Sequence, residues 1–215
     1  WRRARGVVLP LAGDRMRRKA ASTAFVALSA VVATPAHAHL VETGFGAFYD
    51  GIAHLAVTPT DLLVVVALAL LAGQRGTRAA RQTVFALPVA WWVSGIIGAH
   101  WPALAALSLL TTLPFALAGV LVALNAKVWD AGVVAFAIAA GVLHGLTNGA
   151  TLTVADSGGL ALGGVVSGIF FLTTILSAEV VALPTGWPQI VVRVTGSWIA
   201  ATGLLMLGWL ARPMP

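Results

Sequence analysis

The amino-acid sequence predicts an all-α integral membrane protein, a bundle of six transmembrane helices that follows a cleavable signal peptide. Hydrophobic residues make up 59% of the 215 residues and charged residues only 9%, whereas a soluble domain carries roughly 25% charged residues. Six long apolar runs follow one another after residue 58, separated by short polar connections. These observations exclude a soluble globular domain and indicate a multi-pass membrane protein. We expect it in the bacterial cytoplasmic membrane.

The first 38 residues are typical of upstream sequence followed by a secretory signal peptide. Residues 17–19 (RRK) form a basic start, residues 20–33 an apolar segment, and residues 36–38 (AHA) a small-x-small cleavage site. Cleavage would leave His39 as the mature N-terminus, outside the membrane. An uncleaved signal anchor is the alternative, which the short apolar run disfavours. We therefore expect residues 39–215 to form a single six-helix transmembrane domain.

The first mature helix begins with a clear start signal but is short. Thr58 is expected as the N-cap and Pro59 as the first helical residue, with Asp61 reaching back to the cap amide. The apolar run 59–73 covers roughly 22 Å, against a bilayer core of roughly 30 Å. Either the bilayer thins or residues 51–58 continue into it, so we expect a first helix that is broken or re-entrant at its outer end. His54 and Asp61 would then lie near or below the interface, where irregular backbone lines a cavity.

The other five apolar runs predict helices at about 82–99, 103–124, 131–152, 159–183 and 189–211. Basic residues in the connection 74–81, at Lys127 and at Arg193 place these loops in the cytoplasm, while Asp156 falls in an outer loop. Only Arg212 departs from this distribution. Both mature termini are therefore predicted outside.

The basic charge of the chain does not indicate a nucleic-acid partner. Seven of the 13 Lys and Arg residues precede residue 39, and beyond it six basic residues balance six acidic ones. The absence of cysteine excludes disulfides, thiolate metal sites and cysteine nucleophiles. No HExxH motif is present, and Ser167 in GVVSG departs from a protease-like GxSG by one residue. We expect a protein that is not an enzyme.

His144 is the strongest single candidate for a functional residue, because an ionisable side chain within a membrane helix is costly. A polar stripe at helical spacing contains His144, Thr147, Asn148 and Thr151. A ridge of Gly141, Gly145 and Gly149 favours close approach of a second helix. The alternative is a structural histidine that is hydrogen-bonded between packed helices.

The five histidines, His37, His39, His54, His100 and His144, fall in the cleavage region, at the outer surface or in the outer half of a helix. This distribution favours a metal or proton pathway that opens outward, unless it arose by chance. A mature N-terminal His39 would also offer an amine and an imidazole for copper or nickel. Alternatively, it merely follows the cleavage site.

Glu179 and Arg193 lie seven positions on either side of Gly186, the centre of the turn PTGWP. We expect them to face each other across a helical hairpin. A structural ion pair is favoured over a proton relay.

The chain resembles the HupE/UreJ family of membrane proteins, regarded as nickel or cobalt permeases associated with hydrogenase and urease maturation. HLAVTPTD (54–61) stands where the family has HPxxGxDH, and LHGLTNG (143–149) matches a later His-Gly segment. FYDGIAH and LALLAGQRG are similar to flanking phrases of a divergent branch. In this chain Leu55 replaces the motif proline, Leu62 replaces the second histidine, and no carboxylate follows the His-Gly segment before Asp156.

The resemblance implies a permease for a divalent transition metal, with nickel the first choice, then cobalt, and with no tightly bound cofactor. By this resemblance His54, Asp61 and His144 would bind the ion. The polar stripe adds Asn148 and Thr151 as expected oxygen partners, and the mature N-terminus adds His39 as a separate candidate metal ligand. The expected partners are the lipid bilayer, the ion and a metalloenzyme or accessory protein; an oligomer stays open. No GxxxxGK[ST] loop supplies ATP-driven transport. The alternative is a non-transporting membrane subunit or assembly factor that holds a periplasmic metal such as copper.

Overall fold

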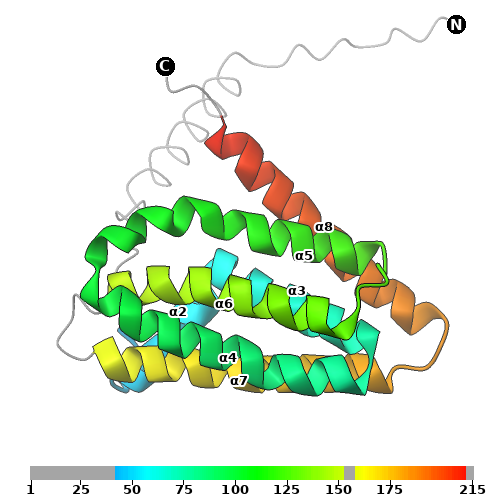
Figure 1. Cartoon of the computed structure of the whole chain (residues 1–215), viewed down its shortest axis with the longest axis horizontal. Helices are drawn as coiled ribbons and strands as arrows, with labels where there is room; N and C mark the ends of the chain where they lie inside the picture. The colour runs from blue at the N-terminus through cyan, green and yellow to red at the C-terminus, as the bar shows by residue number, and fades with distance from the viewer. Residues whose placement is uncertain (1–41, 153–157, 212–215) are drawn as a thin grey trace, which may run out of the picture. The chain divides into compact units, whose positions relative to one another are not determined.

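A computed structural model of the chain describes residues 42–152 and 158–211, which are predominantly helical. Within these ranges lie seven α-helices and one 3₁₀-helix (Figure 1): α2 (Ala47–Val57), α3 (Pro59–Arg75), α4 (Thr77–His100), η1 (Pro102–Thr111), α5 (Thr112–Ala123), α6 (Asp130–Leu152), α7 (Gly158–Ala182) and α8 (Trp187–Leu210). The all-α class is therefore confirmed. The predicted signal peptide, His39, Asp156 and Arg212 lie outside the described residues.

Four of these helices, α4, α6, α7 and α8, are each long and apolar enough to cross a membrane. The pair α2 and α3 meets the same test only when taken together, and the pair is bent by 77°. The described residues thus hold up to five candidate spans. The expected break in the first helix is present at Thr58, as in a broken span or a re-entrant loop, and α3 begins at Pro59 as the sequence indicates.

The prediction of one continuous helix over residues 103–124 is wrong. Here the chain forms η1 and then the 12-residue helix α5. Pro114 has no amide hydrogen, so the carbonyl of Leu110, four residues earlier, cannot make its usual α-helical hydrogen bond. That carbonyl instead accepts from the amide of Thr112. The tighter winding before Thr112 is consistent with this missing bond.

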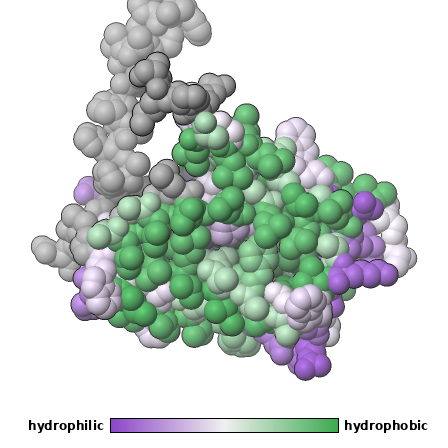
Figure 2. All heavy atoms as spheres, turned by 45° about the horizontal axis from the view of Figure 1, so that its top comes forward, coloured by the Kyte–Doolittle hydropathy of each residue, from purple (hydrophilic) through white to green (hydrophobic). Residues whose placement is uncertain are grey.

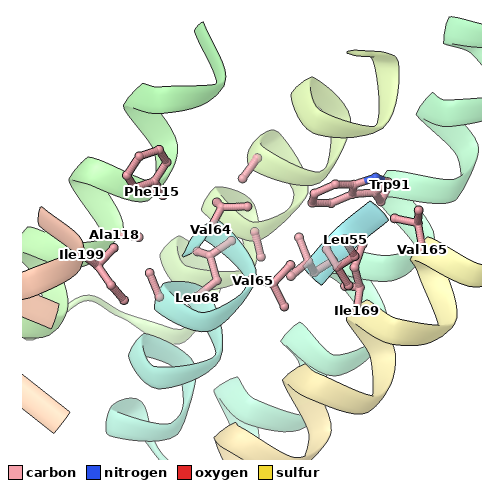
Figure 3. Close-up of a cluster of buried hydrophobic side chains, with 14 of the residues drawn as sticks. Leu55, Val64, Val65, Leu68, Trp91, Phe115, Ala118, Val165, Ile169 and Ile199 are labelled. Carbon is pink, nitrogen blue, oxygen red and sulfur yellow. The ribbon is translucent and has the colours of Figure 1, made fainter. Parts of the chain in front are cut away.

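Helix α3 is the centre of the bundle, and it packs against each of the other six α-helices described. Every residue from Ala67 to Gly73 is buried, as expected of a helix that is apolar on all sides. Figure 3 shows Val64, Val65 and Leu68 of α3 packed among side chains of the surrounding helices. This core fixes the first turn of α3, and with it Asp61, inside the protein.

Helices α4 and α6 approach closely through small residues. A Cβ atom added to Gly149 would collide with the backbone carbonyl of Gly95, and one added to Gly145 would collide with Ser94 and the backbone of Trp91. The Ser94 hydroxyl donates across the interface to the Gly141 carbonyl at 3.1 Å. The glycine ridge predicted from the sequence therefore lies in a close helix contact.

The predicted ion pair between Glu179 and Arg193 is wrong. In the described ranges these exposed side chains form no ion pair with each other, and the Arg193 Nε donates to the Ala123 carbonyl at 2.9 Å. The reason lies in the packing of α8, which lies mainly against α5 rather than against α7. Gly196 and Gly203 bring α8 into tight contact with α5.

The basic residues of the described chain gather at one end of the bundle. Arg75 at the end of α3 donates to the Asn125 side chain, and the Arg78 Nε lies 4.0 Å from the Asp130 Oδ2. Figure 2 shows strongly hydrophilic residues at one end and hydrophobic residues over the long face. We refer to the region of Arg75, Arg78 and Lys127 as the basic end. The side of the membrane on which it lies stays a prediction.

Candidate functional site

The break between α2 and α3 places two ionisable side chains together. Thr58 is extended, with φ −95° and ψ 99°, because a residue that precedes proline disfavours the α conformation. The chain turns at this residue, so His54 in the last turn of α2 approaches Asp61 in the first turn of α3. The His54 Nε2 and the Asp61 Oδ2 are 4.0 Å apart.

Asp61 does not cap its own helix as the sequence suggested. Neither Thr58 nor Asp61 makes a side-chain cap hydrogen bond at the start of α3. Asp61 is only 3% exposed, and its carboxylate instead accepts from two side chains of α6. The His144 Nδ1 donates to Oδ1 at 2.7 Å, and the Asn148 Nδ2 donates to Oδ2 at 2.9 Å. These two donors offset the cost of burying a carboxylate.

Asn148 connects the carboxylate to His54. Because the Asn148 amide nitrogen donates to Asp61, its oxygen is left to accept, and the His54 Nε2 lies 3.3 Å from that oxygen. The His54 Nε2 therefore carries the proton. The Thr58 hydroxyl lies 3.5 Å from the same nitrogen. His54, Asn148, Asp61 and His144 thus form one hydrogen-bonded chain across three helices, which we call the Asp61 network.

Of the two ring nitrogens of His144, one is hydrogen-bonded and the other has no partner among the described residues. The Asp61 carboxylate can only accept, so the Nδ1 of His144 carries a proton. The Nε2 is buried and makes no hydrogen bond in the described part of the chain. When the imidazole is neutral this nitrogen holds a lone pair, the arrangement in which a carboxylate orients a histidine toward a metal. The donor chemistry of His144 therefore suits a transition-metal ion.

The Asp61 network is not arranged around an open centre. Among the described residues no group of three or more His, Asp or Glu side chains is placed to hold a metal ion. The three ionisable members are instead joined by hydrogen bonds, directly or through Asn148. The side chain of His144 is fully buried, whereas that of His54 is 14% exposed. His54 is therefore the ionisable member of the network that reaches the surface.

The structure does not bring Thr151 into the network. Its hydroxyl donates to the carbonyls of Thr147 and Asn148 in its own helix, at 3.0 and 3.1 Å, and the residue is exposed. His100 likewise lies 2.8 Å, through its Nδ1, from the Ile96 carbonyl of its own helix. The structure thus joins four of the residues singled out in the sequence, while their role in metal binding stays a prediction. His39 lies outside the described residues.

Trp91 belongs to the surroundings of the site, although the sequence analysis did not single it out. Its ring centroid lies 5.0 Å from that of His144, and the two planes are inclined by 36°. Trp91 is fully buried, while its neighbour Trp92 is half exposed. A signal was present in the sequence, because tryptophan in membrane proteins is enriched at the interfaces and Trp91 lies in the middle of its helix.

Comparison with known proteins gives a family match. A family model described as HupE / UreJ protein matches residues 26–206, which is most of the chain. No curated protein and no solved structure matches the chain.

Proposed function

The chain belongs to the HupE/UreJ family, and from this premise we propose that it is a permease for a divalent transition-metal ion. The family consists of transporters rather than enzymes, and it is associated with nickel and cobalt uptake for hydrogenase and urease. We place nickel first and cobalt second, with the ion supplied for the maturation of a metalloenzyme. The Asp61 network is the observation that carries the proposal.

The network supports transport because it concentrates ionisable groups inside an apolar bundle. Such groups are expensive within a membrane and usually mark a pathway for an ion or a proton. Two imidazoles and a carboxylate are donors that suit nickel, cobalt or zinc better than magnesium or calcium. Two of these residues, His54 and Asp61, also flank a helix break, where transporters commonly bind their cargo.

A six-helix membrane fold is part of the proposal. The bent pair α2 and α3 supplies one crossing, and η1 with α5 supplies another. The 10 residues of η1 and the 12 residues of α5 would together extend roughly 38 Å, at about 2.0 Å and 1.5 Å per residue. This length exceeds a bilayer core of roughly 30 Å. With α4, α6, α7 and α8, the mature chain would cross six times.

His54 is the entry point in this proposal. An ion that arrives at the exposed edge of the network would meet the His54 Nε2. This nitrogen can bind only after the imidazole changes tautomer, with its proton on Nδ1 instead of Nε2, and after it loses its contact with Asn148. If Asn148 also moves away from Asp61, one carboxylate oxygen becomes free to bind the ion. The hydrogen bond from His144 keeps the carboxylate oriented. Thr58 joins α2 to α3 at the break, and α2 packs closely against α7 at Gly51 and Gly164.

A second candidate function follows from the same geometry. Because the side chains of the Asp61 network are hydrogen-bonded to one another, the chain would also suit a non-transporting subunit or assembly factor. Such a protein would bind a periplasmic metal such as copper, with His39 as a ligand.

Metal accumulation separates the two functions. Cells that lack the gene and cells that regain it are compared for accumulation of nickel, cobalt and copper. We expect restored nickel or cobalt accumulation in the complemented cells. Unchanged accumulation of all three metals, at normal levels of the protein, would refute the permease. Copper bound to the purified protein in that case would favour the assembly factor.

A further inference from the structure

A polar cavity of about 350 Å³ lies at the basic end, away from the Asp61 network. Its walls come from the last turns of α3 and α7, the connection between α5 and α6, and the first turn of α8. Gln74, Arg75, Asn125 and Gln189 supply its polar lining. The metal pathway proposed above uses none of these residues.

Two polar atoms of the cavity residues are buried and have no hydrogen-bond partner in the part of the chain that the structure describes. The Arg75 Nε and the Gln74 Oε1 make no hydrogen bond in the described ranges, although each side chain is anchored at its other atoms. Arg75 donates through Nη2 to Asn125, and Gln74 donates through Nε2 to the Val122 carbonyl at 3.1 Å. A ligand that satisfies both unpaired atoms must accept a hydrogen bond from the N–H group of Arg75 and donate one to the side-chain carbonyl of Gln74.

The cavity also has an uncompensated positive charge. Among the described residues no carboxylate lies within 4.0 Å of the Arg75 guanidinium, and the neighbouring Asp130 lies near Arg78 instead. Glu179 is exposed and does not line the cavity. A negatively charged acceptor is therefore favoured over a neutral one, and guanidinium groups pair well with phosphate.

An apolar groove next to the cavity favours a lipid over a free anion. The groove, about 520 Å³, lies between the first half of α4 and the last half of α7 and is lined by residues such as Val84, Phe85 and Ala178. Val181 lines both the groove and the cavity. Arg81 and Thr77 lie along the same groove. One molecule with a charged head and a long apolar tail matches both surfaces.

We propose that this cavity binds the headgroup of an anionic phospholipid such as phosphatidylglycerol. The phosphate accepts from the Arg75 guanidinium and a headgroup hydroxyl donates to the Gln74 side-chain carbonyl, after both side chains rotate to expose the atoms that are now buried. An acyl chain lies in the groove between α4 and α7. Basic pockets between membrane helices commonly bind anionic headgroups in this way. The bound lipid would hold the ends of α3, α7 and α8 together.

Native mass spectrometry of the full chain in detergent tests the proposal. The wild-type protein is titrated with phosphatidylglycerol and, separately, with phosphatidylcholine, with and without an excess of inorganic phosphate. We expect more phosphatidylglycerol than phosphatidylcholine adducts, and little displacement by phosphate. Arg75→Gln should lower phosphatidylglycerol binding about fivefold. Arg78→Gln is the matched control, because Arg78 is exposed and does not line the cavity, and it should leave binding nearly unchanged.

Equal binding of the two lipids by the wild-type protein would overturn the proposal. So would full displacement by inorganic phosphate, which would indicate a free-anion site, and so would equal losses in Arg75→Gln and Arg78→Gln. If Arg75→Gln does not fold, Gln74→Leu and the lipid selectivity of the wild-type protein decide the question. Gln74→Leu removes the hydroxyl acceptor, so unchanged phosphatidylglycerol binding in that variant would also count against the lipid.

Discussion

Asp61 is the residue on which the candidate site depends, because its two carboxylate oxygens accept from two different side chains of α6. Each of those side chains has a second group available for other contacts. Asn148 passes the connection on to His54, and His144 leaves its Nε2 free in the described part of the chain. A single buried charge therefore sets the proton positions of the whole network.

Asp61→Asn tests this dependence. The substitution keeps the shape of the side chain but removes the charge, and its amide nitrogen cannot accept from His144 or Asn148 as the carboxylate does. We expect nickel uptake to fall by about 10- to 100-fold, the range seen when groups around a metal are altered, while some folded protein remains.

Glu179→Gln is the matched control for Asp61→Asn. It is also a change from carboxylate to amide within a helix, but Glu179 is exposed and pairs with no basic residue described. Its yield and uptake should match the wild type, since isolated surface changes rarely alter stability by more than about 0.5 kcal/mol. If Glu179→Gln abolishes uptake while Asp61→Asn transports normally, the site lies on α7 and the Asp61 network is structural.

His144 requires two variants, because the side chain is both a candidate ligand and a donor to a buried carboxylate. His144→Ala leaves one oxygen of Asp61 without its donor and opens space beside Trp91, at a cost of about 1–3 kcal/mol for the lost partner alone. His144→Asn keeps an amide donor near the position of Nδ1 but removes the Nε2. We expect both variants to lose uptake and the Asn variant to give more folded protein. Measuring yield and nickel uptake together checks this, and uptake at the wild-type level by His144→Asn would show that the Nε2 binds no cargo.

At the scale of the helices, the contact between α4 and α6 positions Asn148 and His144 against Asp61. The two backbones meet at Gly145 and Gly149 with no space for a side chain. Ser94 joins them through its hydrogen bond to the Gly141 carbonyl. Close packing of this kind is a main source of helix association in membranes, where burial of apolar surface contributes little.

Gly145→Ala should therefore disrupt the bundle. A methyl group at this position would collide with the Ser94 side chain and the Trp91 backbone, so α6 must move away from α4 and carry His144 with it. Gly163→Ala is the control, because Gly163 also lies within a helix but has open space around the position of the added methyl. We expect a lower thermal unfolding temperature in detergent for Gly145→Ala and an unchanged or higher one for Gly163→Ala. Equal effects would show that the close contact does not limit stability.

Some features of the helices could be predicted from the sequence and others could not. Pro59 gave the start of α3 correctly because proline suits the first helical turn whatever surrounds it, and the spacing of His144 and Asn148 put them on one helix face. The winding of η1 was missed because apolar composition does not distinguish a 3₁₀-helix from an α-helix. The pairing of Glu179 with Arg193 was wrong because it assumed that consecutive helices pack together.

The candidate site could be predicted only in part. The partners of Asp61 come from α6, 83 and 87 positions away in the chain, and only the tertiary structure shows them.

At the scale of the whole molecule, the two candidate sites lie toward different ends of the bundle. His144 lies eight residues before the end of α6, or roughly 12 Å from that end at 1.5 Å per residue, whereas Arg75 and Arg78 mark the basic end. An ion bound at His54 would therefore still have to pass most of the apolar core to reach the basic end. The lipid proposed there would bind at the far end of that path.

The orientation of the bundle is predicted from the distribution of basic residues and can be measured directly. Basic residues remain on the cytoplasmic side during membrane insertion, so Arg78 should face the cytoplasm and Asp156 the outside. The chain contains no cysteine, so Arg78→Cys and Asp156→Cys each introduce one unique thiol. In intact spheroplasts a membrane-impermeant thiol reagent should label Asp156→Cys alone, and Arg78→Cys should react only after the membrane is opened. Labelling of Arg78→Cys in intact spheroplasts would reverse the orientation, and the edge of the network at His54 would then open toward the cytoplasm, as an exporter requires.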